Sequence, residues 1–164
     1  MMTTRLFTLL LLLGLTSTIL HAQELSWRKH KSLAESLAKE GDFYAAAENY
    51  RMAWEKKQSK AELIYLAAEN YAKVSDYRSA AEAYQHVDVA KAEDPLVLLK
   101  YGRALKQDGQ YDKARTVFQQ LLDTYTGTDK AILQDIVRME TRGIDLTRDM
   151  ATNADRRLEV LHQE

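Results

Sequence analysis

The residue types best suited to metal binding or proton transfer are few in this chain and widely spaced. After position 22 the histidines are His30, His86 and His162, and no two of them lie a helical turn apart. A metal site on a helix needs ligands at such short spacings, and zinc sites often add cysteine, which this chain lacks. We therefore predict no bound metal and no cofactor.

A pair of carboxylates, Asp145 and Asp149, lies one helical turn apart and could serve general acid and base catalysis. That chemistry requires a pocket that separates the two pKa values. Arg138, Arg142 and Arg148 lie close by in the sequence, which favours exposed ion pairs instead. The sequence also contains no G-x-S-x-G, P-loop, EF-hand or H-E-x-x-H motif. We predict that the protein is not an enzyme and keep catalysis only as the alternative to be screened.

Composition narrows the class of protein further. The chain has 164 residues, of which 46% are apolar and 29% charged, as in a folded globular domain. Its 23 basic and 24 acidic residues give no basic excess, which argues against nucleic-acid binding. The absence of cysteine excludes disulfides and thiol chemistry.

The first 22 residues have the layout of a secretory signal peptide. Arg5 precedes an apolar run over 6–20, and Ala22 offers a small residue at a cleavage point before Gln23. The alternatives are an uncleaved anchor and a buried core helix. No second apolar run follows, so we predict no membrane span in the mature chain. The expected location is the periplasm or the outer membrane, or outside the cell.

A repeat of 34 residues organises the rest of the chain. GDFYAA at 41–46 is echoed by SDYRSA at 75–80 and by GQYDKA at 109–114. Other positions keep this register: small residues at Ala34, Ala68 and Gly102 and at Ala46, Ala80 and Ala114, large residues at Leu37, Tyr71 and Leu105, and aromatic residues at Tyr50, Tyr84 and Phe118. Repeats of this length indicate stacked supersecondary units.

Each repeat contains two amphipathic stretches separated by a turn, and so predicts a helical hairpin. The first stretches are 27–39, 61–73 and 95–107. Gly41 and Gly109 suit the left-handed residue that ends a helix, and Ser75 suits it less well. Ser59 to Glu62 fits a capping box, and Asp94 before Pro95 fits an N-cap followed by proline.

This pattern resembles the tetratricopeptide repeat (TPR) family over about 27–128. The likeness rests on large and small residues along the first helix, then Gly-Asp-Tyr, Ala and an aromatic residue along the second. The chain departs from the family at the first-helix tryptophan, replaced by His30, Ile64 and Leu98, and at the repeat-end proline, replaced by Gln58, Ala92 and Thr126. At its position His30 is expected to pack rather than to bind a ligand, and His86 is expected on the surface.

The expected fold is all-α, an α-solenoid of three TPR hairpins with a C-terminal capping helix. The expected parts are a signal peptide at 1–22, a TPR domain at 23–143 and a polar tail at 144–164 that could form a short helix. The TPR domain divides into repeats at about 27–60, 61–94 and 95–128 and a capping helix at 129–143. A terminal helix is needed because a stack of hairpins leaves its last apolar face open.

The resemblance also implies a binding surface, because the first helices of TPR units line a concave groove. Carried over by repeat position, the groove residues are Arg28, Lys31, Glu35, Lys39, Glu62, Tyr65, Glu69, Lys73, Leu96, Leu99, Arg103 and Lys106. Six of them are basic and three acidic. The expected partner is an extended or helical protein segment with some acidic character; the alternative is ordinary solvated helix faces with chance charge.

The carboxylate clamp of chaperone-binding TPR proteins is matched only in part. Lys31 and Lys100 fit its basic positions, whereas Glu35, Leu66 and Leu96 do not. We therefore predict a non-enzymatic interaction or scaffold protein of the bacterial cell envelope that does not capture a C-terminal carboxylate. The alternative is the N-terminal TPR portion of a larger outer-membrane-associated protein anchored to peptidoglycan. The sequence leaves the partner and the oligomeric state open.

Overall fold

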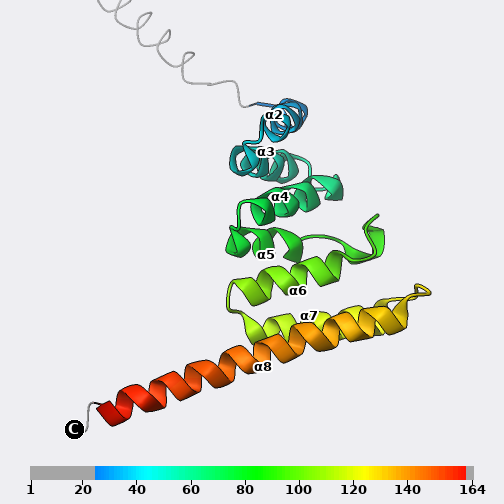
Figure 1. Ribbon diagram of the computed structural model, residues 1–164. Helices are drawn as coiled ribbons and strands as arrows, with labels where there is room; N and C mark the ends of the chain where they lie inside the picture. Colours follow the sequence, from blue (N-terminus) through cyan, green and yellow to red (C-terminus); the bar gives the residue numbers. More distant parts are fainter. Residues whose placement is uncertain (1–24, 162–164) are drawn as a thin grey trace, which may run out of the picture.

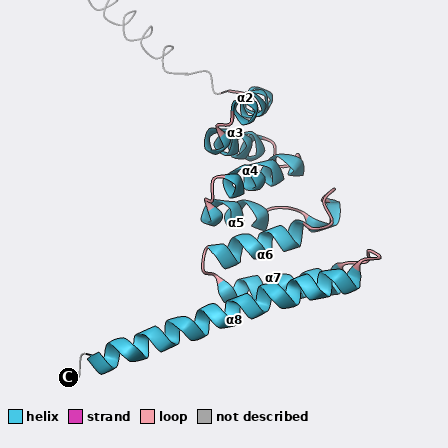
Figure 2. Cartoon of the chain, viewed as in Figure 1, coloured by secondary structure: helices cyan, strands magenta, loops and turns pink. Residues whose placement is uncertain are grey.

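The computed structural model describes residues 25–161, and all regular structure in that range is helical (Figures 1 and 2). The proposed signal peptide at 1–22 lies outside the described residues. The elements are α2 (Trp27–Glu40), α3 (Phe43–Lys56), α4 (Ala61–Lys73), α5 (Tyr77–Gln85), the short 3-10 helix η1 (Val89–Lys91), α6 (Val97–Gln107), α7 (Tyr111–Thr124) and α8 (Lys130–Leu161).

Consecutive helices form antiparallel hairpins, which stack in one direction as an open solenoid (Figure 1). The three hairpins are α2–α3, α4–α5 and α6–α7, and each helix packs on the next along the chain. Helix α8 covers the last hairpin, and its C-terminal half extends beyond the stack. The expected α-solenoid of three hairpins with a terminal helix is therefore confirmed.

The hairpin turns follow from the repeated residues. Gly41, Ser75 and Gly109 all have positive φ, of 87°, 60° and 78°. In the first two repeats the side chain of the following aspartate accepts a hydrogen bond from the backbone N–H three residues on. A left-handed residue thus ends one helix, and the next residue begins the second.

The repeated columns occupy equivalent places in the core. Phe43, Tyr77 and Tyr111 each begin the second helix of a hairpin, and all three are partly buried. The three alanines at 46, 80 and 114 are completely buried, as are the small residues at 34 and 68. The aromatic column at 50, 84 and 118 is also buried. Small residues thus leave room for the aromatic rings: the Phe118 ring packs on Gly102 of the same hairpin, and the Tyr84 ring lies near Tyr65 of its own hairpin and Tyr101 of the next.

The cap of one helix and the first residue of another differ from the expectation. Lys60 is the N-cap residue of α4, and its side chain makes no capping bond, so the capping box at Ser59 does not form. Helix α6 begins at Val97 rather than at Pro95. Asp94 still caps this end, since its carboxylate accepts a hydrogen bond from the backbone N–H of Leu96 at 2.8 Å.

Helix α8 does not end near residue 143, as expected, but runs unbroken from Lys130 to Leu161. Its first half is fixed by Leu133, Val137 and Ile144, which are buried against the solenoid. The expected polar tail after 143 is therefore mostly part of a long helix in the described range.

The reason for this continuity lies in the residues that follow Gly143. Gly143 is 34 residues after Gly109 and so occupies the turn position, yet it is followed by the apolar Ile144 rather than by a capping side chain. Arg148 and Thr152 stand where the third hairpin has its buried alanine and phenylalanine. A second helix folded back here would lack the small and the aromatic contact residue at these two positions, so the chain continues as one helix.

None of the helices between residues 25 and 161 combines the length and the apolar character that crossing a lipid bilayer would require.

Candidate partner-binding groove

The first helices of the hairpins, α2, α4 and α6, and the beginning of α8 lie next to one another and carry the predicted groove residues. Contacts between these helices connect their polar side chains. Lys31 Nζ of α2 lies 3.9 Å from Glu62 Oε1 of α4 and 3.7 Å from Glu35 Oε1 of its own helix. We call the surface formed by these helices the groove.

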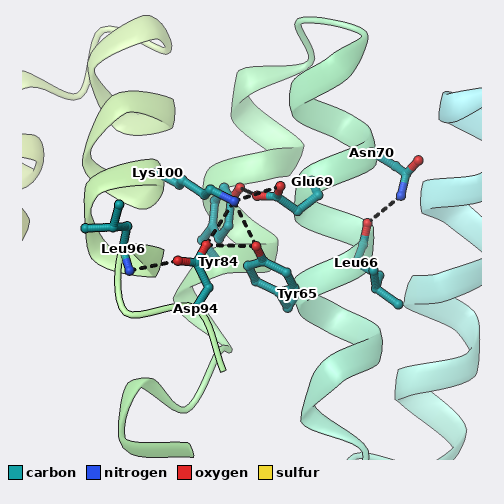
Figure 3. A network of polar contacts seen from close by, with 8 residues as sticks. All are labelled: Tyr65, Leu66, Glu69, Asn70, Tyr84, Asp94, Leu96 and Lys100. Carbon is teal, nitrogen blue, oxygen red and sulfur yellow. Dashed lines mark hydrogen bonds and ion pairs between the residues drawn. The ribbon is translucent and has the colours of Figure 1, made fainter. Parts of the chain in front are cut away.

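A polar cluster around Lys100 occupies the middle of the groove (Figure 3). The Lys100 ammonium donates to the Tyr65 hydroxyl at 2.8 Å and forms ion pairs with Glu69 and Asp94, each at 2.9 Å. The Tyr65 hydroxyl donates to Asp94 at 2.9 Å, and the Tyr84 hydroxyl donates to Glu69. Three helices and the connection before α6 are thereby joined through one cation.

The charges in this cluster stabilise one another. Burial alone would lower the pKa of Lys100, but its bonds to Tyr65, Asp94 and Glu69 outweigh burial and raise the pKa. Burial would raise the pKa of Asp94, yet the hydrogen bond from Lys100 and that from the Leu96 N–H hold it below its usual value. Lys100 and Asp94 therefore stay ionised at neutral pH.

A second cluster joins α6 to α8. Glu140 accepts from Arg103 Nε at 2.6 Å and from the Lys106 ammonium. Burial by itself would raise the pKa of Glu140, but these two hydrogen bonds outweigh it and lower the pKa. The two basic residues predicted for the third repeat are thus paired within the chain, and they fix α8 to the groove.

Two hollows flank these clusters. One, of about 360 Å³, lies between the clusters and is lined by Glu69, Ala72, Tyr77, Tyr84, Lys100, Arg103, Ala104, Lys106, Gln107 and Glu140. The other, of about 520 Å³, lies between the start of α4 and the long α5–α6 connection and is lined by Ser59, Ala61, Glu62, Tyr65, Val87, Asp88, Lys91, Ala92, Glu93 and Asp94. Tyr65 and Asp94 separate the second hollow from Lys100.

The remaining predicted groove residues divide into surface and core. The Arg28 guanidinium lies 4.8 Å from the centre of the Trp27 ring, and the Lys73 ammonium lies 4.6 Å from that of Phe43, while Lys39 is exposed. Leu99 is only 5% exposed and belongs to the core, so its prediction as a groove contact was wrong. Leu96 is partly buried and packs against the core at the start of α6.

The predicted groove omitted Tyr77, Tyr84, Asp94, Lys100 and Glu140, although Lys100 had been matched to a basic position of the carboxylate clamp. With Lys100, Asp94 and Glu140 added, the groove has seven basic and five acidic residues. Its excess of basic residues is therefore smaller than the predicted six against three. Spacing could have revealed the pairs. Lys31 and Glu62 are 31 residues apart, as are Glu69 and Lys100, which is one repeat less one helical turn.

The residues considered for other chemistry occupy structural places. His30 is buried and its Nδ1 hydrogen-bonds with Asn49 Oδ1 at 3.0 Å, whereas His86 is exposed and its ring lies 5.0 Å from that of Trp54. Asp145 pairs with Arg115 of α7, and Asp149 is exposed. Between residues 25 and 161 no three acidic or histidine side chains gather as metal ligands would.

Comparison with known proteins agrees with this architecture. Residues 96–128 match the tetratricopeptide repeat family. The chain resembles the Yersinia enterocolitica type III secretion chaperone SycD, solved with a peptide of the translocator YopD, with 15% identity over 74% of this chain and 93% of that one and a TM-score of 0.56. A second SycD structure, described as an alternative dimer, has the same identity and coverage and a TM-score of 0.55.

The second TPR domain of human RPAP3, solved with the HSP70 peptide SGPTIEEVD, is 20% identical over 71% of this chain and 92% of that one, with a TM-score of 0.54. At these identities the likeness is one of fold. No curated protein sequence matches the chain significantly. The family match covers the third hairpin, and the other two hairpins carry equivalent residues at the same repeat positions.

Proposed function

We propose that this protein is a non-enzymatic interaction module that binds an extended segment of a protein partner in the groove. The observation that carries the proposal is the row of adjacent first helices, which present aromatic and charged side chains beside two hollows of about 360 and 520 Å³. Two proteins of the same fold were solved with peptides, YopD in one case and HSP70 in the other.

The groove chemistry favours a segment with scattered acidic side chains over a bare C-terminal carboxylate. Lys100 is already bound by two carboxylates, and Lys31 lies near two more. The basic excess is carried instead by exposed residues such as Arg28, Lys39 and Lys73, spread along the groove. Such a distribution steers an acidic chain and holds it at several weak contacts.

Site-specific photo-crosslinking tests the location of binding. A photoreactive amino acid replaces Gln107, which lines the smaller hollow, or Glu93, which lines the larger one. Gln120, exposed on α7, is the matched control. The same partner protein should crosslink from both groove positions in native cells and not from the control. Equal crosslinking from Gln120, or none from the groove, contradicts the proposal.

Charge reversal tests the chemistry of binding with a peptide made from the crosslinked segment. Arg28→Glu with Lys39→Glu should weaken its affinity about tenfold and flatten its salt dependence, because two exposed groove cations are lost. Lys57→Glu, in the exposed loop after α3, makes the same kind of change away from the groove and should leave affinity unchanged. These variants spare Arg103 and Lys106, whose pairing with Glu140 holds α8.

We also propose that residues 1–22 direct export and are removed, so that the module acts in the cell envelope. The support is the sequence of this segment, with Arg5, the apolar run over 6–20 and Ala22. N-terminal sequencing of the chain recovered from fractionated cells should give a start at Gln23. Recovery of the uncleaved chain in the cytosol contradicts this part of the proposal and leaves the groove untouched.

A further inference from the structure

An exposed apolar stripe runs along α8 on a side that the solenoid does not cover. Ile132, Met139, Leu146 and Met150 are 56 to 72% exposed, although they are among the largest apolar residues of the helix. The buried residues Leu133, Val137 and Ile144 point about a third of a turn away from them. A row of this kind on a soluble helix indicates a surface that binds another protein.

The stripe has the spacing of a coiled-coil seam. Ile132, Met139 and Leu146 follow one another every seven residues, and so do Ile136, Gly143 and Met150, displaced by four. These two series are the d and a positions of a heptad repeat that begins near residue 132 and covers three heptads. Ile136 is partly buried and Gly143 partly exposed, so the seam borders the packed face of α8.

Charged residues of alternating sign flank the seam. They occupy the g positions of these heptads, one residue before each a position. They are Asp135, Arg142, Asp149 and Arg156, all exposed. Residues at g positions meet across an antiparallel helix pair and determine its orientation and register. In the chain itself Asp135 also pairs with Arg138 at 2.8 Å, on the side away from the seam.

We propose that α8 pairs with α8 of a second copy of this chain, as an antiparallel coiled coil centred between residues 144 and 145. In this register Met139 of one copy meets Met150 of the other, and Gly143 meets Leu146, so that a small residue faces a large one. The same register places Asp135 opposite Arg156 and Arg142 opposite Asp149, twice each by symmetry. Every contact between g positions is then attractive.

The neighbouring arrangements are disfavoured by charge. Sliding one copy by a heptad places Asp135 opposite Asp149 and Arg142 opposite itself, or else Asp149 opposite itself and Arg142 opposite Arg156. A parallel pair places Asp135 beside Glu140 of the other copy. Like charges in these places disfavour a wrong register. The charge pattern of α8 is thus complementary to itself in one antiparallel register.

Sedimentation velocity of the purified chain over a wide range of concentration tests the pairing. The wild-type chain should form a dimer. Arg142→Glu or Asp149→Arg alone creates two repulsive contacts and should raise the dissociation constant roughly 10- to 100-fold, and the double variant should restore it. Arg138→Glu makes the same charge change on another side of α8 and should leave the dimer intact. Circular dichroism checks that each variant folds.

Disulfide crosslinking tests the register, since the natural chain has no cysteine. A mixture of the Met139→Cys and Met150→Cys variants should crosslink under mild oxidation, whereas either variant alone should not. A chain that stays monomeric, a dimer insensitive to both single charge reversals, or self-crosslinking of Met139→Cys overturns the proposal. Neither dimer test depends on partner binding in the groove. If the groove proposal were wrong, only the photo-crosslinking and peptide-binding experiments would show it.

Discussion

Three residues with the same task differ in chemistry at the hairpin turns. Gly41 and Gly109 take the left-handed conformation without strain, whereas Ser75 takes it at φ 60° and carries a Cβ. A residue other than glycine pays a steric cost in this region. The turn between α4 and α5 is therefore the least favourable of the three, as the repeat alignment of the sequence suggested.

Replacing that serine should stabilise the protein. Ser75→Gly is expected to raise the free energy of unfolding by about 1 kcal/mol, because the gain in the turn exceeds the added entropy of the unfolded chain. Gly109→Ser is the matched reverse change and should lower it by a similar amount. Urea denaturation of both variants measures the difference. A loss of stability in Ser75→Gly would show that the serine side chain contributes something that the turn geometry does not reveal.

Gly102 shows the opposite requirement, for space rather than for backbone freedom. A Cβ at this position would lie less than 3.0 Å from three ring carbons of Phe118, which is completely buried. Gly102→Ala should lower the free energy of unfolding by about 1 to 3 kcal/mol, because neither α6 nor the ring has room to move. Gly143→Ala is the control, since its Cβ would meet only the Lys106 ammonium, at 3.8 Å. Thermal unfolding of both variants should show opposite changes, with the control stabilised by its better helix propensity.

At the scale of elements, the docking of α8 depends on the ionised form of Glu140. Its pKa is lower in the folded protein than the ordinary value of 4.5, as the hydrogen bonds from Lys106 and Arg103 outweigh burial. Its contribution to stability is therefore complete at neutral pH and is lost as the pH falls through 4.5 and below. Once Glu140 is protonated, its ion pairs with Arg103 and Lys106 are lost.

We expect Glu140→Gln to reduce the acid sensitivity of the protein. Between pH 7 and about pH 3 the wild type should lose more unfolding free energy than the variant, because the variant has no charge to lose at this position. The variant should also be less stable at pH 7. Urea midpoints at the two pH values provide the measurement, and equal losses in both proteins would mean that Glu140 does not couple α8 docking to pH. Asp94 adds to the loss in both proteins equally.

The regular elements were predictable because the same residues recur every 34 positions, so that each repeat supports the reading of the others. The start of α4 fell at its predicted residue, and the turns at 41, 75 and 109 followed from residue type alone. The continuation of α8 through Gly143 was not predicted. The helix continues because Arg148 and Thr152 stand where a hairpin needs a small and an aromatic residue. The residues of the turn itself do not show this.

The groove was predictable only as a surface. Repeat position correctly placed its charged side chains on adjacent helices, but the pairing of Arg103 and Lys106 with Glu140 depends on how α8 docks. Leu99 was misassigned because its apolar neighbours in the sequence did not show that it lies on the packed side of α6. Both details depend on contacts between helices, which short-range patterns do not encode.

At the scale of the whole molecule, stability is a sum over hairpins and the contacts between them. Within residues 25–161, α8 alone covers the outer side of the α6–α7 hairpin, through Leu133, Val137 and Ile144. A chain ending after Thr128 should therefore lose about 3 kcal/mol or more of unfolding free energy and should expose apolar surface. A chain ending after Arg148 keeps all three residues and should retain most of its stability at low concentration. Chemical denaturation and dye binding to exposed apolar surface distinguish the two.

Glu140 also has a consequence for any ligand that carries carboxylates. Because Glu140 belongs to the same chain as Arg103 and Lys106, it competes with a ligand carboxylate for these cations at an effective concentration on the order of millimolar. An acidic side chain of a ligand that displaces Glu140 from these cations gains little binding free energy. Tight capture must come from many modest contacts made together along the helices, and a long flexible sequence can supply these where a small anion cannot.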